Sequence, residues 1–185
     1  MKIEFHTIDN APQAAKQDLQ MAQKAFGTVP NLLAGMAASP AAVKAYMALA
    51  GNLKAHGSLS PVEQQVVYIA ISAKNGCDYC VAAHTAGANM AKMPDDVLGA
   101  LRQQRPLPDA KLDALANFAL AMLEQRGFMS DSDLAAFTKA GFDQQHMLEV
   151  ITIMAQKTMS NYFNHVAKTP LDEMFQPMAW QAAAE

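Results

Sequence analysis

The chain has 185 residues, of which 51% are hydrophobic and 17% charged, and its formal net charge is −3 at pH 7. Because no cluster of lysine and arginine supplies the positive surface that phosphate groups require, neither nucleic acid nor an anionic membrane is an expected partner. The high hydrophobic content predicts either an alanine-rich helical core or a subunit that buries further surface in an oligomer.

Hydropathy gives no sign of secretion or membrane insertion. The first ten residues contain no continuous apolar run of the kind found in signal peptides, and every later segment is interrupted by polar residues. We therefore expect a cytoplasmic protein. In a reducing compartment, a closely spaced cysteine pair is more often catalytic or metal-binding than a structural disulfide.

Glycine and proline divide the first part of the chain into helical segments. Residues 1–10 alternate in polarity and could form an extended arm, and a surface helix is predicted over residues 11–26, ending at Gly27. A short apolar helix is predicted over residues 31–38. An amphipathic helix should follow over residues 40–56.

The next helix has the clearest start signal in the chain. Ser60, Pro61 and Glu63 combine a capping box with proline at the first helical position. The apolar run that follows is therefore predicted to be helical rather than extended. Asn75-Gly76 should break this helix, and a new helix should begin at Cys77 and continue to about residue 92.

The rest of the chain is also predicted to be helical. Caps and stop signals define four further helices, over residues 94–104, 109–126, 130–141 and 143–168. No segment between Pro40 and Lys168 requires a strand, so the predicted fold class is all-α. We expect a single domain with an N-terminal arm and helices (1–39), a helical core (40–168) and a C-terminal tail (169–185).

A weak internal similarity appears when the second half of the chain is shifted by 83 positions onto the first. The shift pairs, among others, Val67 with Val150, Lys74 with Lys157, and Tyr79 with Tyr162. Such a pattern predicts two similar helical hairpins. Ser160 and Phe163 take the places of the two cysteines, so one thiol site per chain is expected.

Both cysteines lie in the segment from Ser72 to His84. Cys77 and Cys80 are three residues apart and His84 follows Cys80 by four, so on a helix the three side chains share one face. A helix N-terminus and a neighbouring imidazolium both favour the thiolate, which is the nucleophile in disulfide and peroxide chemistry. The segment therefore predicts a redox dithiol.

Two other interpretations of the cysteines remain open. A closed zinc site usually has four ligands, whereas Cys77, Cys80 and His84 supply three and the chain has no second cysteine pair. The two thiols could also be inert and buried. We expect neither a metal nor another cofactor.

The run Asn75-Gly76-Cys77-Asp78-Tyr79-Cys80, followed by Ala82-Ala83-His84, resembles the core of the alkyl hydroperoxidase D and carboxymuconolactone decarboxylase superfamily. Residues 26–31 and 161–165 resemble its peroxidase-related branch. The resemblance implies an AhpD-like helical bundle that forms a homo-oligomer, either a trimer or a hexamer. It also implies reduction of hydroperoxides, or electron transfer to a peroxiredoxin, with a lipoyl or thioredoxin-like carrier as dithiol donor.

The resemblance also implies roles for the three site residues. Cys80 would be the attacking thiolate, activated by His84, and Cys77 would resolve the sulfenic acid to a disulfide. Position on the helix points the other way, because a helix that begins at Cys77 lowers the pKa of Cys77 more than that of Cys80. We favour Cys80, since only Cys80 has the imidazole four residues further on.

One position departs from the family pattern. The family's peroxidases usually carry a glutamate twelve residues before the first cysteine, and here that residue is Gln65, which cannot exchange a proton at neutral pH. Glu63 is the nearest carboxylate and either replaces it or simply caps its helix. His165 is a further candidate for the site.

Two further functions share this fold class. A non-enzymatic redox sensor or adaptor would use disulfide formation to change an interface. A decarboxylase-like enzyme of the same fold is disfavoured, because lactone chemistry does not need paired thiols.

Overall fold

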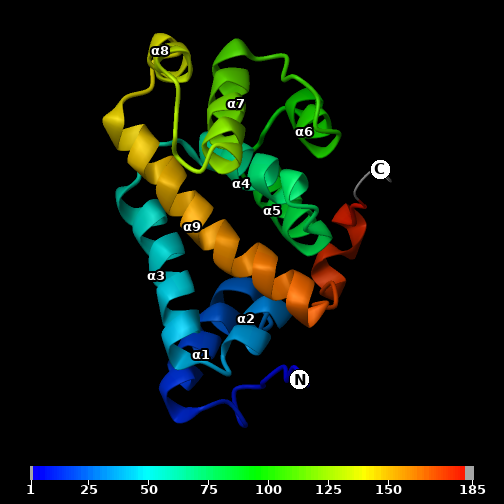
Figure 1. Cartoon of the computed structure of the whole chain (residues 1–185). Coiled ribbons are helices and arrows are strands. Elements are labelled where there is room, and N and C mark those ends of the chain that lie inside the picture. The colour runs from blue at the N-terminus through cyan, green and yellow to red at the C-terminus, as the bar shows by residue number, and fades with distance from the viewer. Residues whose placement is uncertain (1, 182–185) are drawn as a thin grey trace.

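The computed structural model describes residues 2–181. These residues form nine α-helices and two 3-10 helices without any strand, so the predicted all-α class is confirmed for the described part of the chain (Figure 1). The elements are η1 (Gln13–Ala15), α1 (Lys16–Phe26), α2 (Asn31–Met36), α3 (Pro40–His56), α4 (Pro61–Lys74), α5 (Asp78–Met90), α6 (Asp95–Arg102), α7 (Ala110–Glu124), α8 (Asp131–Lys139), α9 (Gln144–Ala167) and η2 (Glu173–Met178). Residues 182–185 of the predicted tail lie outside the described residues.

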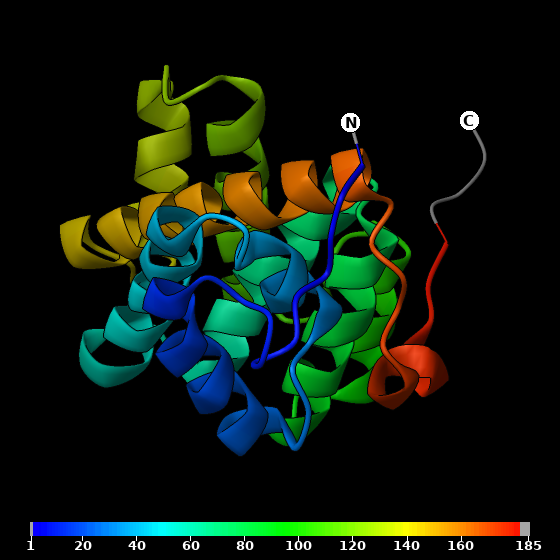
Figure 2. The same cartoon turned by 90° about the horizontal axis from the view of Figure 1, so that it is seen from below.

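Helix α4 is the central element, and it packs against α5, α6, α7 and α9. One hydrophobic cluster joins α4 to α6, α7 and the first half of α9. A second cluster joins α1, α2 and α3 to the first turn of α5 and to η2, and it contains both cysteines. Helix α9 crosses the molecule beside both α3 and α4 (Figures 1 and 2). The cysteines therefore lie deep in the fold, where the two halves of the chain meet.

Local signals account for most of the helix boundaries. Ser60 caps α4 in a full capping box, and Asp143 and Ser130 cap α9 and α8 in the same way. Gly27 ends α1 in the left-handed conformation, with φ of 80°. The predicted helix over residues 11–26 differs only at its start, where a 3-10 turn precedes Lys16.

The predicted second hairpin is wrong. Helices α4 and α5 are separated by a break at which Gly76 has φ of 68°, a conformation that glycine adopts without steric cost. The 83-residue shift pairs Gly76 with Met159, whose Cβ disfavours a positive φ. Met159 accordingly lies within the continuous helix α9. Without a glycine at this point, the second copy of the sequence pattern folds as one straight helix.

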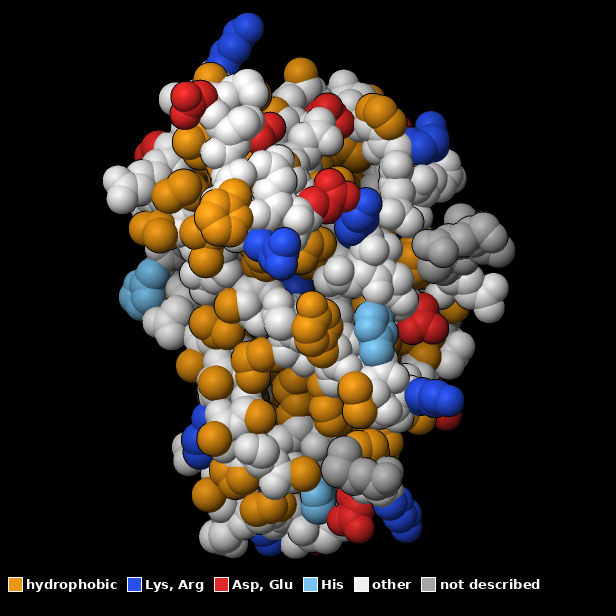
Figure 3. Space-filling model, in the orientation of Figure 1, with side chains coloured by type: hydrophobic (Ala, Val, Ile, Leu, Met, Phe, Trp, Pro, Cys, Tyr) orange, Lys and Arg blue, Asp and Glu red, His pale blue; other side chains and the backbone are white. Residues whose placement is uncertain are grey.

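The outer face of α9 carries large hydrophobic side chains. Exposed fractions are 52% for Leu148, 41% for Ile151, 60% for Tyr162 and 68% for Val166. Hydrophobic side chains gather on the face of the molecule along which α9 runs (Figure 3). Single exposed apolar residues are ordinary, but a row on one helix is typical of an interaction surface.

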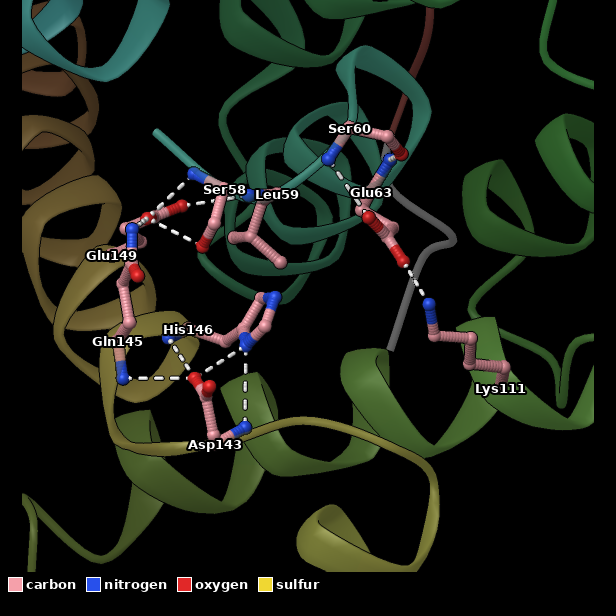
Figure 4. A network of polar contacts seen from close by, with 9 residues as sticks. All are labelled: Ser58, Leu59, Ser60, Glu63, Lys111, Asp143, Gln145, His146 and Glu149. Atoms are coloured by element: carbon pink, nitrogen blue, oxygen red, sulfur yellow. Dashed lines mark hydrogen bonds and ion pairs between the residues drawn. The ribbon is translucent and has the colours of Figure 1, made fainter. Parts of the chain in front are cut away.

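A buried carboxylate ties α9 to the loop before α4 (Figure 4). Glu149 accepts hydrogen bonds from the Ser58 amide at 2.7 Å, the Ser58 hydroxyl at 2.8 Å and the Leu59 amide at 2.9 Å. These bonds satisfy backbone donors that would otherwise be left without partners in the interior. The position of α4, and with it the break that holds the cysteines, is therefore anchored to α9.

None of the helices in residues 2–181 combines the length and hydropathy needed to cross a bilayer.

Candidate active site

The break between α4 and α5 places both cysteines at the start of α5. Gly76, with its positive φ, ends the path of α4, and the Cys77 amide donates a hydrogen bond to the Ser72 carbonyl oxygen at 2.9 Å. Cys77 is the N-cap of α5. Cys80 follows within the first turn. Both thiols are free and almost fully buried, with 0% of Cys77 and 2% of Cys80 exposed. Any reagent must therefore reach them through an internal cavity.

Helix α9 supplies a polar contact to both sulfur atoms. The Asn164 amide nitrogen lies 3.2 Å from the Cys80 Sγ and 3.7 Å from the Cys77 Sγ. The Asn164 oxygen has no hydrogen-bond partner within the described residues. An amide donor aimed at sulfur favours the thiolate over the thiol, and the shorter of the two contacts is to Cys80.

The surroundings push the pKa values of the two thiols in opposite directions. The hydrogen bond to Cys80 and burial raise the pKa of Cys77. Burial also disfavours the Cys80 thiolate, but the hydrogen bond from Cys77, the charge of Lys157 and the Asn164 amide together lower the pKa of Cys80 below its usual value. These surroundings favour Cys80 over Cys77 as the thiolate of the pair. The tertiary contacts outweigh the helix-terminus effect, which favoured Cys77.

His84 lies one turn after Cys80, between two polar partners. Its Nδ1 is 3.0 Å from the Gln65 Oε1, its Nε2 is 2.6 Å from the Lys157 Nζ, and its ring stacks on Tyr68 at 4.3 Å between centroids. An ammonium group can only donate, so Nε2 accepts from Lys157 and the ring proton lies on Nδ1, facing the amide oxygen.

Burial and the charge of Lys157 lower the pKa of His84 well below its usual value. The imidazole is therefore neutral at neutral pH. This direction disfavours the imidazolium that the sequence predicted at His84, and the positive charge that lowers the pKa of Cys80 comes from Lys157. His84 instead holds that lysine in place.

Lys157 is the principal residue that sequence reasoning missed. Its side chain comes from α9 and only 1% of the residue is exposed. The sequence does contain a signal, since Lys157 follows Val150 and Ile153 at helical spacing on the buried face of α9. A lysine on such a face is unusual enough to mark a functional position.

An apolar cavity of about 300 Å³ connects these groups to the surface. Its polar lining comes from Tyr46, Gln65, Cys80, His84 and Lys157, and the rest is largely hydrophobic. Three lining side chains are also exposed to solvent: Phe26 (49%), Met90 (85%) and Met174 (38%). The cavity therefore opens to the surface past a hydrophobic rim.

Tyr79, one of the two residues between the cysteines, holds the C-terminal segment against the site. The Tyr79 hydroxyl donates to the Asp172 carboxylate at 2.5 Å and accepts from the Leu32 amide at 3.3 Å. Asp172 also accepts from the Asn31 amide at the start of α2. This places η2 against α5 (Figure 2). Phe175 of η2 forms part of the cavity wall.

Glu63 and His165 are not part of this arrangement. The Glu63 carboxylate accepts from the Ser60 amide at 2.8 Å and from Lys111 at 2.7 Å (Figure 4), so Glu63 caps its helix. The polar partners of His84 are Gln65 and Lys157 instead. His165 lies on the exposed face of α9 and does not line the cavity. Gln65, by contrast, contacts His84 through its Oε1. Across residues 2–181, no group of three His, Cys, Asp or Glu side chains is arranged to hold a metal ion, so the zinc interpretation gains no support.

The described residues form an all-α protein with an AhpD-like fold and a buried dithiol at a helix break. Residues 40–109, which include α3 to α6 and the whole dithiol segment, match the model of the Carboxymuconolactone decarboxylase family.

Two solved structures have the same fold. One is an uncharacterized peroxidase-related protein from Ralstonia eutropha JMP134, described as an alkylhydroperoxidase AhpD core, with a TM-score of 0.81 and 22% identity over 95% of both chains. The other is an uncharacterized peroxidase-related protein from Silicibacter sp. TM1040, with a TM-score of 0.77 and 20% identity over 95% of both chains. At these identities the similarity establishes the fold. No curated protein matched the chain.

Proposed function

We propose that this protein is a thiol-dependent oxidoreductase that reduces hydroperoxides, or relays electrons to a peroxiredoxin, through Cys77 and Cys80. The observation that carries this proposal is the different placement of the two buried thiols. Cys80 lines an apolar cavity and has the shorter contact to the Asn164 amide, and its surroundings favour it over Cys77 as the thiolate. A nucleophile with an adjacent resolving thiol is the arrangement that peroxide reduction requires.

The reaction proceeds in three balanced steps. The Cys80 thiolate attacks one peroxide oxygen, the O–O bond breaks, and a sulfenic acid and an alkoxide form. The Cys77 thiol then condenses with the sulfenic acid, which gives a disulfide and releases water. A dithiol donor finally reduces the disulfide by exchange and becomes oxidised itself.

The buried position of the thiols restricts the electron donor. A lipoyl group on its flexible arm, or the exposed dithiol of a thioredoxin-like carrier, would approach Cys80 through the cavity opening at Phe26, Met90 and Met174. The apolar rim suits the aliphatic part of such an arm. Neither nucleic acid nor a membrane is proposed as a partner.

We also propose that the chain forms a homo-oligomer, either a trimer or a hexamer. The row of exposed hydrophobic residues along α9 supports this proposal, because burial between copies would remove it from water. Light scattering on the purified protein tests it, and Ile151→Lys with Tyr162→Lys should reduce the molecular mass. A wild-type protein that is monomeric at all concentrations would contradict the proposal.

A redox sensor or adaptor is the second candidate, and one observation favours it. Tyr79 lies between the two cysteines and also holds Asp172 of the C-terminal segment. A disulfide between Cys77 and Cys80 would change the turn that carries Tyr79. The redox state could then be passed to the surface without any peroxide turnover.

Stopped-flow reaction of the reduced protein with a small organic hydroperoxide separates the two functions. Cys80→Ser should abolish thiolate consumption, and Cys77→Ser should stop at a sulfenic acid that a dimedone reagent captures. The double variant gives the background rate. If Cys77→Ser is inert and Cys80→Ser reacts, the two roles are reversed. Wild-type protein that ignores peroxide yet exchanges quickly with dithiols would favour the sensor.

A further inference from the structure

A buried cation stands beside the dithiol without a carboxylate partner. Lys157 is 1% exposed, and in residues 2–181 the ion pairs of lysine involve Lys44, Lys74 and Lys111 instead. The Lys157 Nζ has a neutral partner, the His84 Nε2 at 2.6 Å. A buried ammonium group is costly unless a negative charge compensates it. Some group in the cavity should therefore be its anion.

The titratable side chains that surround Lys157 leave one candidate. Helix α3 contributes Tyr46, α4 contributes Tyr68, and α5 contributes Tyr79, Cys80 and His84, while α2 contains no titratable residue. Burial raises the pKa of the three tyrosines, so they remain uncharged, and the surroundings of His84 favour its neutral imidazole. Cys80 is the one group of this set that the surroundings favour as an anion.

We propose that Lys157 is a further catalytic residue, whose ammonium group is the counter-ion of the Cys80 thiolate and the proton donor to the leaving alkoxide. This inference rests on the proposed peroxide reduction. Lys157 and Cys80 line the same cavity, so a peroxide attacked by the sulfur has its leaving oxygen within the same enclosed space. Protonation of the leaving group by a positioned acid typically accelerates such a step by about 10² to 10⁴.

The proton balance closes over one catalytic cycle. Attack by the thiolate on ROOH gives the sulfenic acid and RO⁻, and Lys157 passes one proton to RO⁻, which leaves as ROH. Lys157 is then a neutral amine, and Cys80, now a sulfenic acid, no longer carries the negative charge that paired with it. Condensation with Cys77 releases water. Reduction by the donor dithiol delivers two protons, and Cys80 returns one of them to Lys157, restoring the ion pair.

The same assignment accounts for Gln65 at the position of the family's glutamate. Gln65 accepts from the His84 Nδ1 at 3.0 Å, and His84 accepts from Lys157, so the chain of donors orients the lysine without removing its proton. A carboxylate at this position would favour a charged imidazole at His84, which would repel the Lys157 ammonium. A neutral amide keeps the proton on the lysine until the O–O bond breaks.

The first test measures the thiolate directly. In the Cys77→Ser background, the pH dependence of thiolate ultraviolet absorbance is compared between the parent, Lys157→Met, Lys157→Arg and the control Lys74→Met, which alters an exposed lysine of α4. We expect the pKa of Cys80 to rise by about 1 or more in Lys157→Met, which means at least about tenfold less thiolate below that pKa. Arginine should retain most of the effect. An unchanged titration in Lys157→Met would overturn the counter-ion role.

The second test isolates proton donation, in the same background and at a pH where Cys80 is fully ionised in every variant. Lys157→Met should react with an organic hydroperoxide at least about tenfold more slowly than the parent, yet nearly as fast with iodoacetamide, whose leaving iodide needs no proton. Equal losses with both reagents would overturn the donor role. Circular dichroism checks the fold, and Lys157→Gln provides a second uncharged variant.

The two proposals fail in different ways. If the parent thiolate ignores hydroperoxides, the proposed function and the proton-donor role both fail, while the absorbance titration still decides the counter-ion role. If the parent reacts and Lys157→Met reacts equally fast, the proposed function stands and the proton-donor role of Lys157 fails, while the absorbance titration decides the counter-ion role.

Discussion

Replacing Gln65 with glutamate tests the polar chain beside the dithiol. The new carboxylate would lie about where the amide oxygen is now, 3.0 Å from the His84 Nδ1. At an effective dielectric constant of ~20, opposite charges at this distance attract by about 5 kcal/mol. Desolvation of the partly buried carboxylate offsets several kcal/mol of this attraction. Neighbouring opposite charges of this kind raise the pKa of a histidine by about 1 to 3.

An imidazolium at His84 would stand 2.6 Å from the Lys157 ammonium, and repulsion between the two cations should drive the proton off the lysine. We therefore expect Gln65→Glu to raise the pKa of His84 and to slow the reaction with hydroperoxide. Nitrogen-detected NMR follows the His84 titration, and stopped-flow absorbance follows the rate. Gln20→Glu, on the exposed side of α1, serves as the control. A faster peroxide reaction in Gln65→Glu would refute the reasoning, since it would show that the site works better with a carboxylate relay.

Three other substitutions probe the supporting contacts. Glu149→Ala should lower the free energy of unfolding by about 2 kcal/mol or more in urea titrations, because the Leu59 amide loses a buried charged acceptor. Burial raises the pKa of Glu149, but the hydrogen bonds from the Leu59 and Ser58 amides outweigh burial and lower it. The stabilisation by Glu149 should therefore be fully present above the unfolded-state pKa of about 4.3 and be lost as the pH falls through the folded-state pKa. Asn164→Leu removes the amide donor to the Cys80 sulfur and should slow alkylation by iodoacetamide near neutral pH by about tenfold. Tyr79→Phe breaks the tie to the C-terminal segment and should speed thiol labelling by a bulky maleimide more than by a small one.

Each of these substitutions has an outcome that contradicts its reasoning. For Glu149→Ala, it is wild-type stability at neutral pH. For Asn164→Leu, it is an alkylation rate that matches wild type at every pH. For Tyr79→Phe, it is an equal acceleration of labelling with both maleimides. Tyr162→Phe, which alters an exposed tyrosine of α9, is the control.

Helix limits could be predicted because they depend on neighbouring residues. The Ser60 capping box and the left-handed Gly76 act within one turn of the chain, and both lie where the sequence pattern placed them. The prediction of a second hairpin was wrong because this local signal, the glycine, is absent from the second copy. Val150 and Tyr162 repeat Val67 and Tyr79, but the helix does not break between them, because Met159 stands where the first copy has a glycine.

The charges at the site depend on contacts between distant parts of the chain. Lys157 is separated from His84 by 73 positions, and Asn164 is separated from Cys80 by 84. Nothing in local spacing indicates that a lysine on one helix will meet an imidazole on another. Burial and opposing charges, which shift pKa values most strongly, exist only after the helices pack.

The sequence by itself determined an all-α chain with a dithiol at the break before α5, since caps, periodicity and one glycine act locally. Only the tertiary structure decided that Cys80 rather than Cys77 is favoured as thiolate, that His84 is neutral, and that Glu63 merely caps its helix. The reason is electrostatic: the free energy of a buried charge depends on which groups the whole fold places within a few ångströms of it.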